Sequence, residues 1–534
     1  EQRMFINERV CEGCGDCSDK SNCLSIVPVE TQYGRKRRVD QSSCNKDFSC
    51  REGFCPSFVS VQGGRLRRLA GVAEVPRHLQ LLPEPDRPDL LNDRPYNILV
   101  TGIGGTGVVT ISAMITMAAH LEGQACQAID QFGMAQKGGA VTSHIRLAAT
   151  ANAISAVHLD SGSADLVLGC DALVAAGDLA LKTVSSERTR LVINTHQAIT
   201  GHFTRSPDLE YPKDDLDERL KQATGASHLT FIDATRIATR LMGDAIATNM
   251  FMLGYAYQRG LIPVSSSGIE QAITLNGIAV ESNIQTFRWG RRAALDIEAV
   301  SDLAYGKPTS RNAEPETLSA LIETRTRDLT DYQNATYAGR YQALIQVARE
   351  AEETRAAGLS GFTLAVARFA YKLMAYKDEY EVARLYSDSA FTQELNETFE
   401  GPFRLQFHFA PPVFSTLDPH TGLATKRTYG HWMFGVLKLL ARLRRLRGSV
   451  FDPFGHTKER RMERALITTY EATIRELASG LNHDNHALAI EIASLADGIR
   501  GYGHVKERHL EEVQARQEEL LARWRTHEPR AAAS

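Results

Sequence analysis

The chain has 534 residues, of which 43% are hydrophobic and 23% are charged, and its formal net charge at pH 7 is −3. This length predicts two or three domains of ordinary globular composition. The near-neutral charge excludes bulk attraction to nucleic acid or to a membrane surface, and no apolar run approaches the roughly 20 residues that a membrane span needs.

Cysteines concentrate at the start of the chain. Seven of the nine lie within the first 55 residues, and the first three form the run C-x2-C-x2-C at Cys11, Cys14 and Cys17. Thiolates at this spacing hold three corners of one cubane iron–sulfur cluster, and a distant Cys-Pro supplies the fourth corner. Because Cys55 precedes a proline, we assign a first 4Fe-4S cluster to these four cysteines.

A second, incomplete run follows. Cys44 and Cys50 flank Asp47, which stands where the middle cysteine is expected. In two-cluster ferredoxins the cysteine after one run ligates the other cluster, so Cys23 is expected to join this second set. The sequence thus predicts a second cluster on Cys23, Cys44 and Cys50, with Asp47 or a hydroxide on the fourth iron. A carboxylate holds such iron more weakly than a thiolate, so this corner is expected to be labile and to give a 3Fe-4S form.

Other interpretations of the cysteines are a zinc site, a disulfide framework, or one cluster rather than two. Zinc prefers two CxxC pairs separated by a spacer, whereas three cysteines at successive x2 gaps suit a cluster. Disulfides are disfavoured because nothing resembles a signal peptide, and reduced cysteines indicate the cytoplasm. Cys126 and Cys170 lie in apolar segments and are predicted to be buried hydrophobic residues. Since the chain starts without Met, just before the cluster motif, we expect it to be one piece of a larger polypeptide.

The ferredoxin-like iron–sulfur module is predicted to span residues 1–71. Its basic segment GRKRRV, residues 34–39, favours a solvated hairpin. The alternatives are a docking patch for an acidic electron carrier and screening of the clusters' negative charge. Residues 72–95 carry recurrent prolines among charged residues and are predicted to form an extended linker.

Residues 96–305 alternate between short apolar segments and helical patterns. Strands are predicted at 97–101, 125–129, 140–146, 166–169, 191–194 and 229–232, and helices at 108–121, 234–242 and 247–258. Such alternation predicts a doubly wound, mostly parallel α/β domain.

A glycine loop joins the first of these strands to the first helix. It contains Gly102, Gly104, Gly105 and Gly107. Glycines let a backbone approach a diphosphate, and the helix start offers N–H donors, so these residues are predicted to bind a cofactor. Lys137, in a second glycine-rich segment, is expected to face the same edge and reach a phosphate or carboxylate. Asp130 stands where an NAD site has an acid for the ribose. A tight turn that binds nothing is the alternative.

Residues 306–534 are predicted to form a mainly α-helical C-terminal domain. Helices are expected at 310–331, 334–357, 361–376, 432–447, 458–478 and 506–525, and one strand at 404–409.

These motifs together resemble the 2-oxoacid:ferredoxin oxidoreductases, most closely the indolepyruvate group in its large fused form. SNCLS (21–25), SSCNKDFSC (42–50) and GFCPSF (53–58) resemble that group's cluster region. The GxGGxG loop with FGMAQKGG at 132–139 resembles its gamma domain. FDPFGHTKERRMERAL (451–466) and IRGYGHVKERHL (499–510) resemble its extra C-terminal domain. The resemblance covers nearly the whole chain.

The resemblance implies a reaction in which an aryl 2-oxoacid, CoA and oxidised ferredoxin give an acyl-CoA, carbon dioxide and reduced ferredoxin. Thiamine diphosphate with Mg²⁺ supplies the carbon chemistry in that family. The sequence has no GDG thiamine motif. The resemblance therefore implies a thiamine-binding partner chain or N-terminal domains in a multimeric complex, with ferredoxin as electron acceptor. We expect no nucleic-acid or membrane partner. The alternatives are an iron–sulfur NAD(P)-dependent reductase that uses the GxGGxG loop, and an electron carrier whose gamma domain binds nothing.

Overall fold

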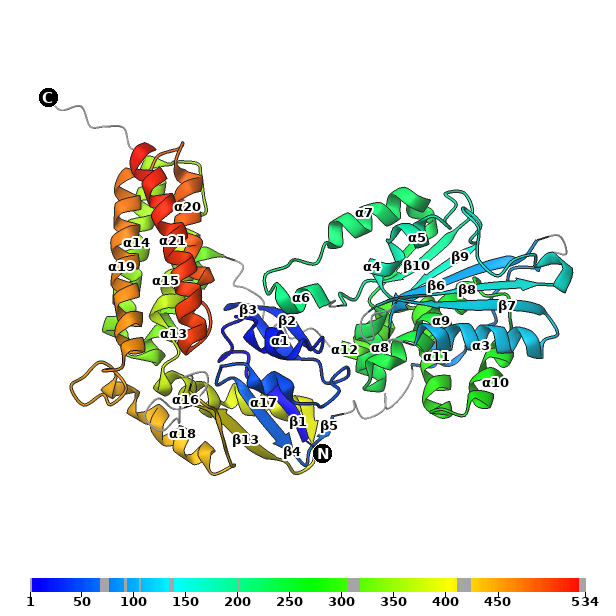
Figure 1. Cartoon of the computed structure of the whole chain (residues 1–534), viewed down its shortest axis with the longest axis horizontal. Helices are drawn as coiled ribbons and strands as arrows, with labels where there is room; N and C mark the ends of the chain where they lie inside the picture. Colours follow the sequence, from blue (N-terminus) through cyan, green and yellow to red (C-terminus); the bar gives the residue numbers. More distant parts are fainter. Residues whose placement is uncertain are drawn as a thin grey trace. The chain divides into compact units, whose positions relative to one another are not determined.

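The computed structural model describes residues 2–67, 76–90, 94–104, 107–133, 139–198, 201–305, 317–410 and 424–527. The chain forms two compact units, labelled by element in Figure 1. We call Glu1–Arg65 with Ser310–Ser534 the cysteine unit, and Leu66–Thr309 the sheet unit. The domain boundaries expected at residues 71, 95 and 305 stay predictions.

The sheet unit contains a six-stranded sheet in the order β11-β10-β9-β6-β8-β7. Its strands are β6 (Tyr96–Ile103), β7 (Ala125–Phe132), β8 (Ala140–Ala148), β9 (Leu166–Gly169), β10 (Arg190–Asn194) and β11 (Leu229–Ile232). Strands β6, β9, β10 and β11 are parallel, whereas β8 runs antiparallel to both β6 and β7. The predicted strands and the mixed α/β class with parallel strands are therefore confirmed.

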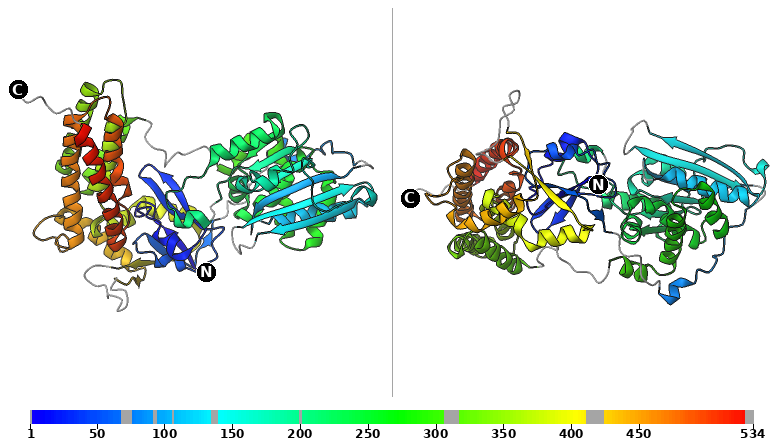
Figure 2. Two further views of the ribbon diagram at one scale, coloured as in Figure 1. Left: turned by 45° about the horizontal axis from the view of Figure 1, so that its top comes forward. Right: turned by 90° about the horizontal axis from the view of Figure 1, so that it is seen from below.

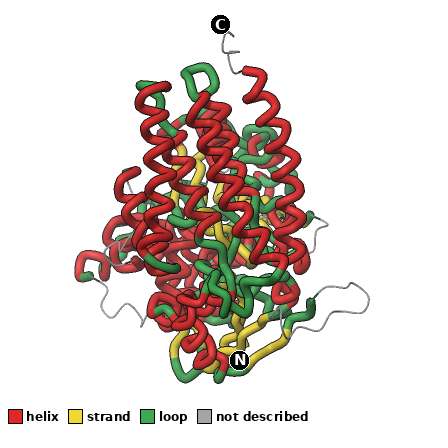
Figure 3. The backbone as a smooth tube through the Cα atoms, turned by 90° about the vertical axis from the view of Figure 1, so that its left-hand side faces the viewer, coloured by secondary structure: helices red, strands yellow, loops and turns green. Residues whose placement is uncertain are grey.

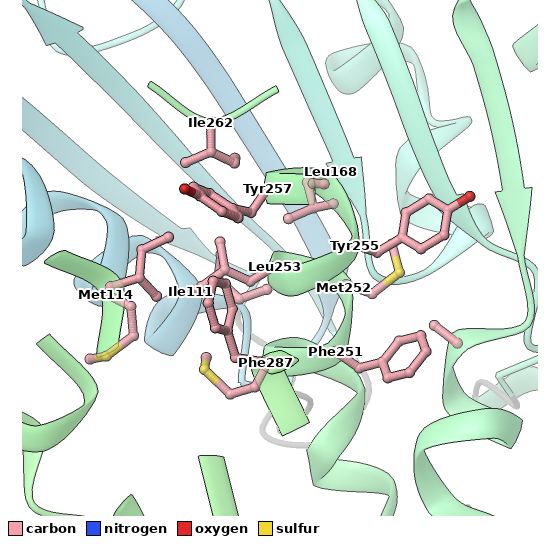
Figure 4. Packing of buried hydrophobic residues seen from close by; sticks show 14 of the residues in the cluster. Ile111, Met114, Leu168, Phe251, Met252, Leu253, Tyr255, Tyr257, Ile262 and Phe287 are labelled. Carbon is pink, nitrogen blue, oxygen red and sulfur yellow. The ribbon is translucent and has the colours of Figure 1, made fainter. Parts of the chain in front are cut away.

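Helices cover both faces of this sheet because alternate strand residues point to opposite sides. Ile98 and Val100 of β6 join one apolar core, while Leu99 joins the other. The first core is formed with α3 (Val108–Leu121), α8 (Ala234–Met242), α9 (Thr248–Gln258), α10 (Ser266–Asn276), α11 (Val280–Leu295) and α12 (Ile297–Tyr305), and the second with α4 (Ala172–Ala175), α5 (Asp178–Leu181) and α7 (Lys213–Thr224). Figure 4 shows Ile111, Phe251 and Phe287 packed in the first core.

Two glycines bring α9 and α11 into backbone contact. A Cβ on Gly254 would lie 2.0 Å from the carbonyl oxygen of Phe287, and one on Gly290 would lie 2.0 Å from that of Phe251. Any larger side chain would force the helices apart, which explains glycine at both positions.

The cysteine unit contains a four-stranded sheet in the order β1-β4-β13-β14. Its strands are β1 (Gln2–Ile6), β4 (Phe58–Gln62), β13 (Arg404–Phe409) and β14 (Arg427–Tyr429). The central strand β4 pairs antiparallel with β1 on one side and β13 on the other. A separate hairpin joins β2 (Ile26–Thr31) to β3 (Gly34–Val39). The strand predicted at 404–409 is confirmed, and it completes the sheet of the N-terminal segment.

The rest of the cysteine unit is helical, as predicted. Its helices are α13 (Leu318–Tyr332), α14 (Ala335–Arg355), α15 (Phe362–Met374), α16 (Glu379–Ser387), α17 (Ser389–Thr398), α18 (Met433–Arg442), α19 (Lys458–Gly480), α20 (His486–Ser494) and α21 (Gly503–His527). Helices α14, α15 and α19 run side by side around one apolar core (Figures 1 and 2), and Figure 3 shows how helices dominate this region. The predicted start of α13 lies outside the described residues.

The remaining elements are short. They are α1 (Asp16–Ser21), α2 (Arg77–Gln80), α6 (Gly201–Arg205), β5 (Arg65–Leu66), β12 (Phe399–Glu400) and the 3-10 turns η1 (Ser49–Glu52), η2 (Ala151–Ala153), η3 (Ala226–His228), η4 (Ala245–Ala247), η5 (Leu443–Leu446) and η6 (Leu495–Gly498). Within the described ranges, no helix combines the length and apolar character that crossing a bilayer requires.

Candidate functional site

One pocket of the cysteine unit is lined by Cys11, Cys14, Cys17 and Cys55. Apolar side chains of Ile6, Phe54 and Phe58 complete much of its wall. Cys17 lies in the first turn of α1, and Cys55 lies between η1 and β4. The structure therefore brings together the four cysteines that the sequence assigns to the first cluster.

Close backbone packing holds these segments together. Gly13 has a φ of +70°, and a Cβ there would lie 2.3 Å from the carbonyl oxygen of Arg35 in the β2–β3 hairpin. A Cβ on Gly53 would lie 2.7 Å from the Cα of Cys17. Glycine is needed at both positions because the first cysteine run is pressed between the hairpin and the segment before Cys55.

The buried thiols favour their neutral form unless a cation compensates them. Burial raises the pKa values of Cys11, Cys14 and Cys17, and the neighbouring Cys55 raises each of them further. Thiolates gathered in this way are stable only beside positive charge, such as that of a bound metal, because metal coordination deprotonates a thiol.

Two cations of the hairpin lie beside this pocket. Lys36 and Arg37 on β3 are only 6% and 2% exposed, and Arg37 lines the pocket. Burial lowers the pKa of Lys36 to about 8, while Cys11 and Glu12 act in the opposite direction. The predicted hairpin is present, but its description as solvated is wrong for these two residues. Their positions agree with the alternative of charge screening.

Glu12 balances this cluster of cations. Its carboxylate pairs with the Lys377 ammonium from the segment before α16. Burial alone would raise the pKa of Glu12, but Lys377 and Lys36 lower it to about 2. The carboxylate therefore stays ionised and ties the first cysteine run to the C-terminal region.

The second predicted set of ligands also converges. Cys50 packs in the same apolar cluster as Cys23 and Cys44. Burial raises the pKa of Cys50 to about 12, and Cys23, Cys44 and Asp47 lie close enough to contribute to that rise.

Asp47 has a structural role at this position. Its exposed carboxylate accepts hydrogen bonds from the backbone N and the Oγ of Ser49, at 3.0 and 2.8 Å, at the start of η1. Within the described ranges, no group of three or more His, Cys, Asp or Glu side chains is arranged to hold a metal ion. Both ligand sets therefore stay predictions.

The glycine loop lies at the carboxyl end of β6. Gly102 is still part of that strand, opposite Val141, and the Gly104 backbone N–H donates to the Gly139 carbonyl oxygen at 2.7 Å. Gly107 precedes α3 with a φ of +83°, and a Cβ there would lie 2.1 Å from Asn249 Nδ2. Gly105 and Lys137 lie outside the described residues.

Asp130 is not adjacent to this loop. It lies on β7, and β8 separates β7 from β6. Its Oδ1 accepts a hydrogen bond from Ser143 Oγ at 2.5 Å. Cys170 is buried and Cys126 is half-buried in the sheet unit, in agreement with their predicted packing role.

Two polar residues at the same sheet edge were not singled out from the sequence. Asp171 follows β9, its Oδ1 accepts from the Val174 backbone N–H at 3.0 Å, and burial raises its pKa to about 6. Asn194 ends β10 and donates to the Cys170 carbonyl oxygen at 3.0 Å. Their signal was a polar residue at the end of an apolar strand or two residues beyond it. Such carboxyl edges are where open α/β sheets bind ligands.

Comparison with known families gives two matches. Residues 97–293 match the family described as pyruvate ferredoxin/flavodoxin oxidoreductase. Residues 318–519 match a family of unknown function, DUF6537.

Similar proteins are subunits of oxidoreductases. Indolepyruvate oxidoreductase subunit IorB of Methanothermobacter thermautotrophicus is 30% identical over 203 residues, which are 38% of this chain and 98% of that protein. The subunit of the same name from Archaeoglobus fulgidus is 28% identical over 202 residues, covering 37% of this chain and 95% of that protein. Among solved structures, pyruvate oxidoreductase subunit PORC of Thermotoga maritima gives a TM-score of 0.28 at 22% identity, covering 37% of this chain and 96% of that one.

Proposed function

This chain belongs to the 2-oxoacid:ferredoxin oxidoreductase family, of the indolepyruvate type, and we propose that it is the iron–sulfur and gamma component of an aryl 2-oxoacid oxidoreductase. A partner chain or N-terminal domains would hold thiamine diphosphate and Mg²⁺. There indolepyruvate or a similar 2-oxoacid and CoA would become an acyl-CoA and carbon dioxide. This chain would pass the released electrons to ferredoxin in the cytoplasm.

The observation that carries the proposal is the pocket lined by Cys11, Cys14, Cys17 and Cys55. These thiolates would hold a 4Fe-4S cluster, which accepts and donates single electrons when bound. The aromatic rings of Phe54 and Phe58, which line the pocket, would limit the access of water to the thiolates. The guanidinium of Arg37 offsets their negative charge.

The second set supports a second cluster. Cys23, Cys44 and Cys50 lie together with the Asp47 carboxylate nearby. Since residues 50–55 form one short segment that carries a ligand of each set, the two clusters would lie close enough for electron exchange. Asp47 would have to exchange its hydrogen bonds from Ser49 for iron, which agrees with a labile corner.

The sheet unit would cap the thiamine and CoA site of the partner. Gly102, Gly104 and Gly107 place backbone groups at the carboxyl end of β6, where Asp171 and Asn194 also lie at the ends of neighbouring strands. We also propose Gly105 of this loop, and Lys137 of the second glycine-rich segment, as ligand contacts.

The NAD(P)-dependent alternative fits this sheet less well. An NAD site of the usual kind has an acid at the end of the strand adjacent to the glycine loop, where it binds the ribose. Asp130 lies two strands away from β6, which corresponds to about 10 Å at the usual strand spacing, and it is held by Ser143.

Electron delivery with the thiamine-binding partner tests the proposal. The anaerobic complex should reduce viologen or ferredoxin when given CoA and indolepyruvate or phenylpyruvate, whereas the chain alone should oxidise neither acid. Cys11→Ser should slow electron delivery far more than it weakens 2-oxoacid binding, because its thiolate serves after the carbon chemistry. Cys126→Ser, the same change away from both ligand sets, should have no such effect.

Three results would contradict the proposal. They are CoA-dependent oxidation by the chain alone, a complex indifferent to Cys11→Ser, and bleaching of the chain's absorbance by NADH without an added flavoprotein. The last result would favour the reductase alternative.

A further inference from the structure

The region that matches the family of unknown function contacts the segments that carry the predicted cluster ligands. Tyr386 of α16 donates from its hydroxyl to the Pro56 carbonyl oxygen at 2.6 Å. Tyr502, just before α21, donates to the Val10 carbonyl oxygen at 2.6 Å. These two bonds fix the segments that carry Cys55 and Cys11, so residues 318–519 contact the backbone beside the candidate site.

Lys426 makes the most informative of these contacts. It precedes β14, and its Nζ donates to the Arg51 carbonyl oxygen at 3.0 Å and also to the carbonyl oxygen of Gly53. Both carbonyls belong to the segment between Cys50 and Cys55. A single ammonium group therefore holds the segment that joins the two ligand sets.

The charges around Lys426 come from both sets. Burial lowers the pKa of its ammonium group, and Cys55, Cys17, Asp16 and Cys50 all lie near enough to oppose that shift. Cys17 and Cys55 belong to the first set and Cys50 to the second. By contrast, the thiols that act on Arg37 are those of the first run.

We propose that Lys426 is a positioning residue that holds the segment between the clusters and raises the reduction potential of both. The inference rests on the proposed function, since it requires the clusters to be present. Reduction adds one electron and no atom to a cluster, so it increases the negative charge near the ammonium. A fixed cation in a partly buried site stabilises the more negative state, and net charge and hydrogen bonding set cluster potentials.

Redox titration of the full chain tests this role. The wild type and the variants Lys426→Gln, Lys426→Met and Lys426→Arg are prepared anaerobically, assayed for iron, and titrated with dithionite and mediators under EPR detection. Lys458→Met is the matched control, because that side chain is 87% exposed. Lys426→Gln keeps an amide donor for the carbonyls but removes the charge.

The inference predicts that both charge-removing variants keep iron and need more reducing conditions. Their one-electron equilibria should shift at least tenfold, which is 59 mV for each cluster. Lys426→Arg and Lys458→Met should titrate like the wild type. Wild-type potentials in Lys426→Gln would overturn the inference, and so would loss of iron from all three Lys426 variants, which would leave a packing role alone. A wild type without iron would instead refute the proposed function.

Discussion

His408 should make the docking of β13 on β4 sensitive to acid. Its Nε2 lies 2.8 Å from Ser60 Oγ on β4, and its Nδ1 lies 3.1 Å from Thr428 Oγ1 on β14. Burial, reinforced by the charges of Lys426 and Arg51, lowers its pKa from 6.5 to about 4. Below pH 6.5 the unfolded chain takes up the proton and the folded chain resists it. The contribution of the neutral His408 imidazole to stability is therefore fully present above pH 6.5 and is lost as the pH falls toward 4.

The size of the effect follows from the two pKa values. Integrating the linkage relation from pH 7.5 to pH 5 gives a loss of about 2 kcal/mol from this one imidazole. Amide hydrogen exchange in β4 and β13 reports the free energy of local opening in each condition. His408→Gln, which offers an amide to the same hydroxyls without titrating, should lose about 2 kcal/mol less than the wild type over this range.

His456→Gln is the control, since His456 is exposed and no part of this sheet. It should follow the wild type at both pH values. An equal loss of opening free energy in the wild type and in His408→Gln would refute the claim that a neutral, buried imidazole joins the strands.

Two further substitutions test the packing beside Cys17 and the charge of the buried Asp171 carboxylate. Gly53→Ala places a Cβ 2.7 to 2.9 Å from backbone and Cβ atoms of Cys17. The variant should therefore lose about 1–3 kcal/mol of stability and about half of its bound iron. The control variant Gly339→Ala, whose new Cβ has nothing within 4 Å, should keep all of its iron. Asp171→Asn keeps the cap on α4 but does not titrate. Because burial raises the pKa from 3.8 to about 6, the wild type loses stability as the pH rises through that interval. At pH 7.5 the free energy of opening of β9, measured by hydrogen exchange, should be up to about 3 kcal/mol higher in the variant. An unchanged opening free energy would contradict this reasoning, because it would show that the folded chain compensates the charge of the Asp171 carboxylate.

Local signals made the sheet unit predictable. Strand β9 and helix α8 lie at the predicted residues because an apolar run or an amphipathic period is bounded by clear stop signals. In α8, the Asp233 side chain accepts from the Arg236 backbone N–H at the start, and Gly243 ends the helix at a φ of +83°. Each of these features is visible in a few consecutive residues.

Long-range pairing was not predictable from the sequence. The segment predicted as a strand at 404–409 gave no sign that it would pair with β4, because strand periodicity does not specify a partner. For the same reason Lys36 and Arg37 looked solvated in a basic run, although β3 buries both against the thiols. Lys426 carries no local motif at all, and only the tertiary structure places its Nζ on the Gly53 carbonyl.

The metal content of the purified chain tests the central claim most directly. Two cubane clusters would give about eight iron atoms and about eight acid-labile sulfides per chain, or about seven iron atoms if the Asp47 corner is empty. Anaerobic preparation, iron and sulfide analysis, and EPR after dithionite reduction measure this in one sample. About four iron atoms would contradict the second cluster. Stoichiometric zinc, or no iron at all, would contradict the account of Cys11, Cys14, Cys17 and Cys55 as cluster ligands.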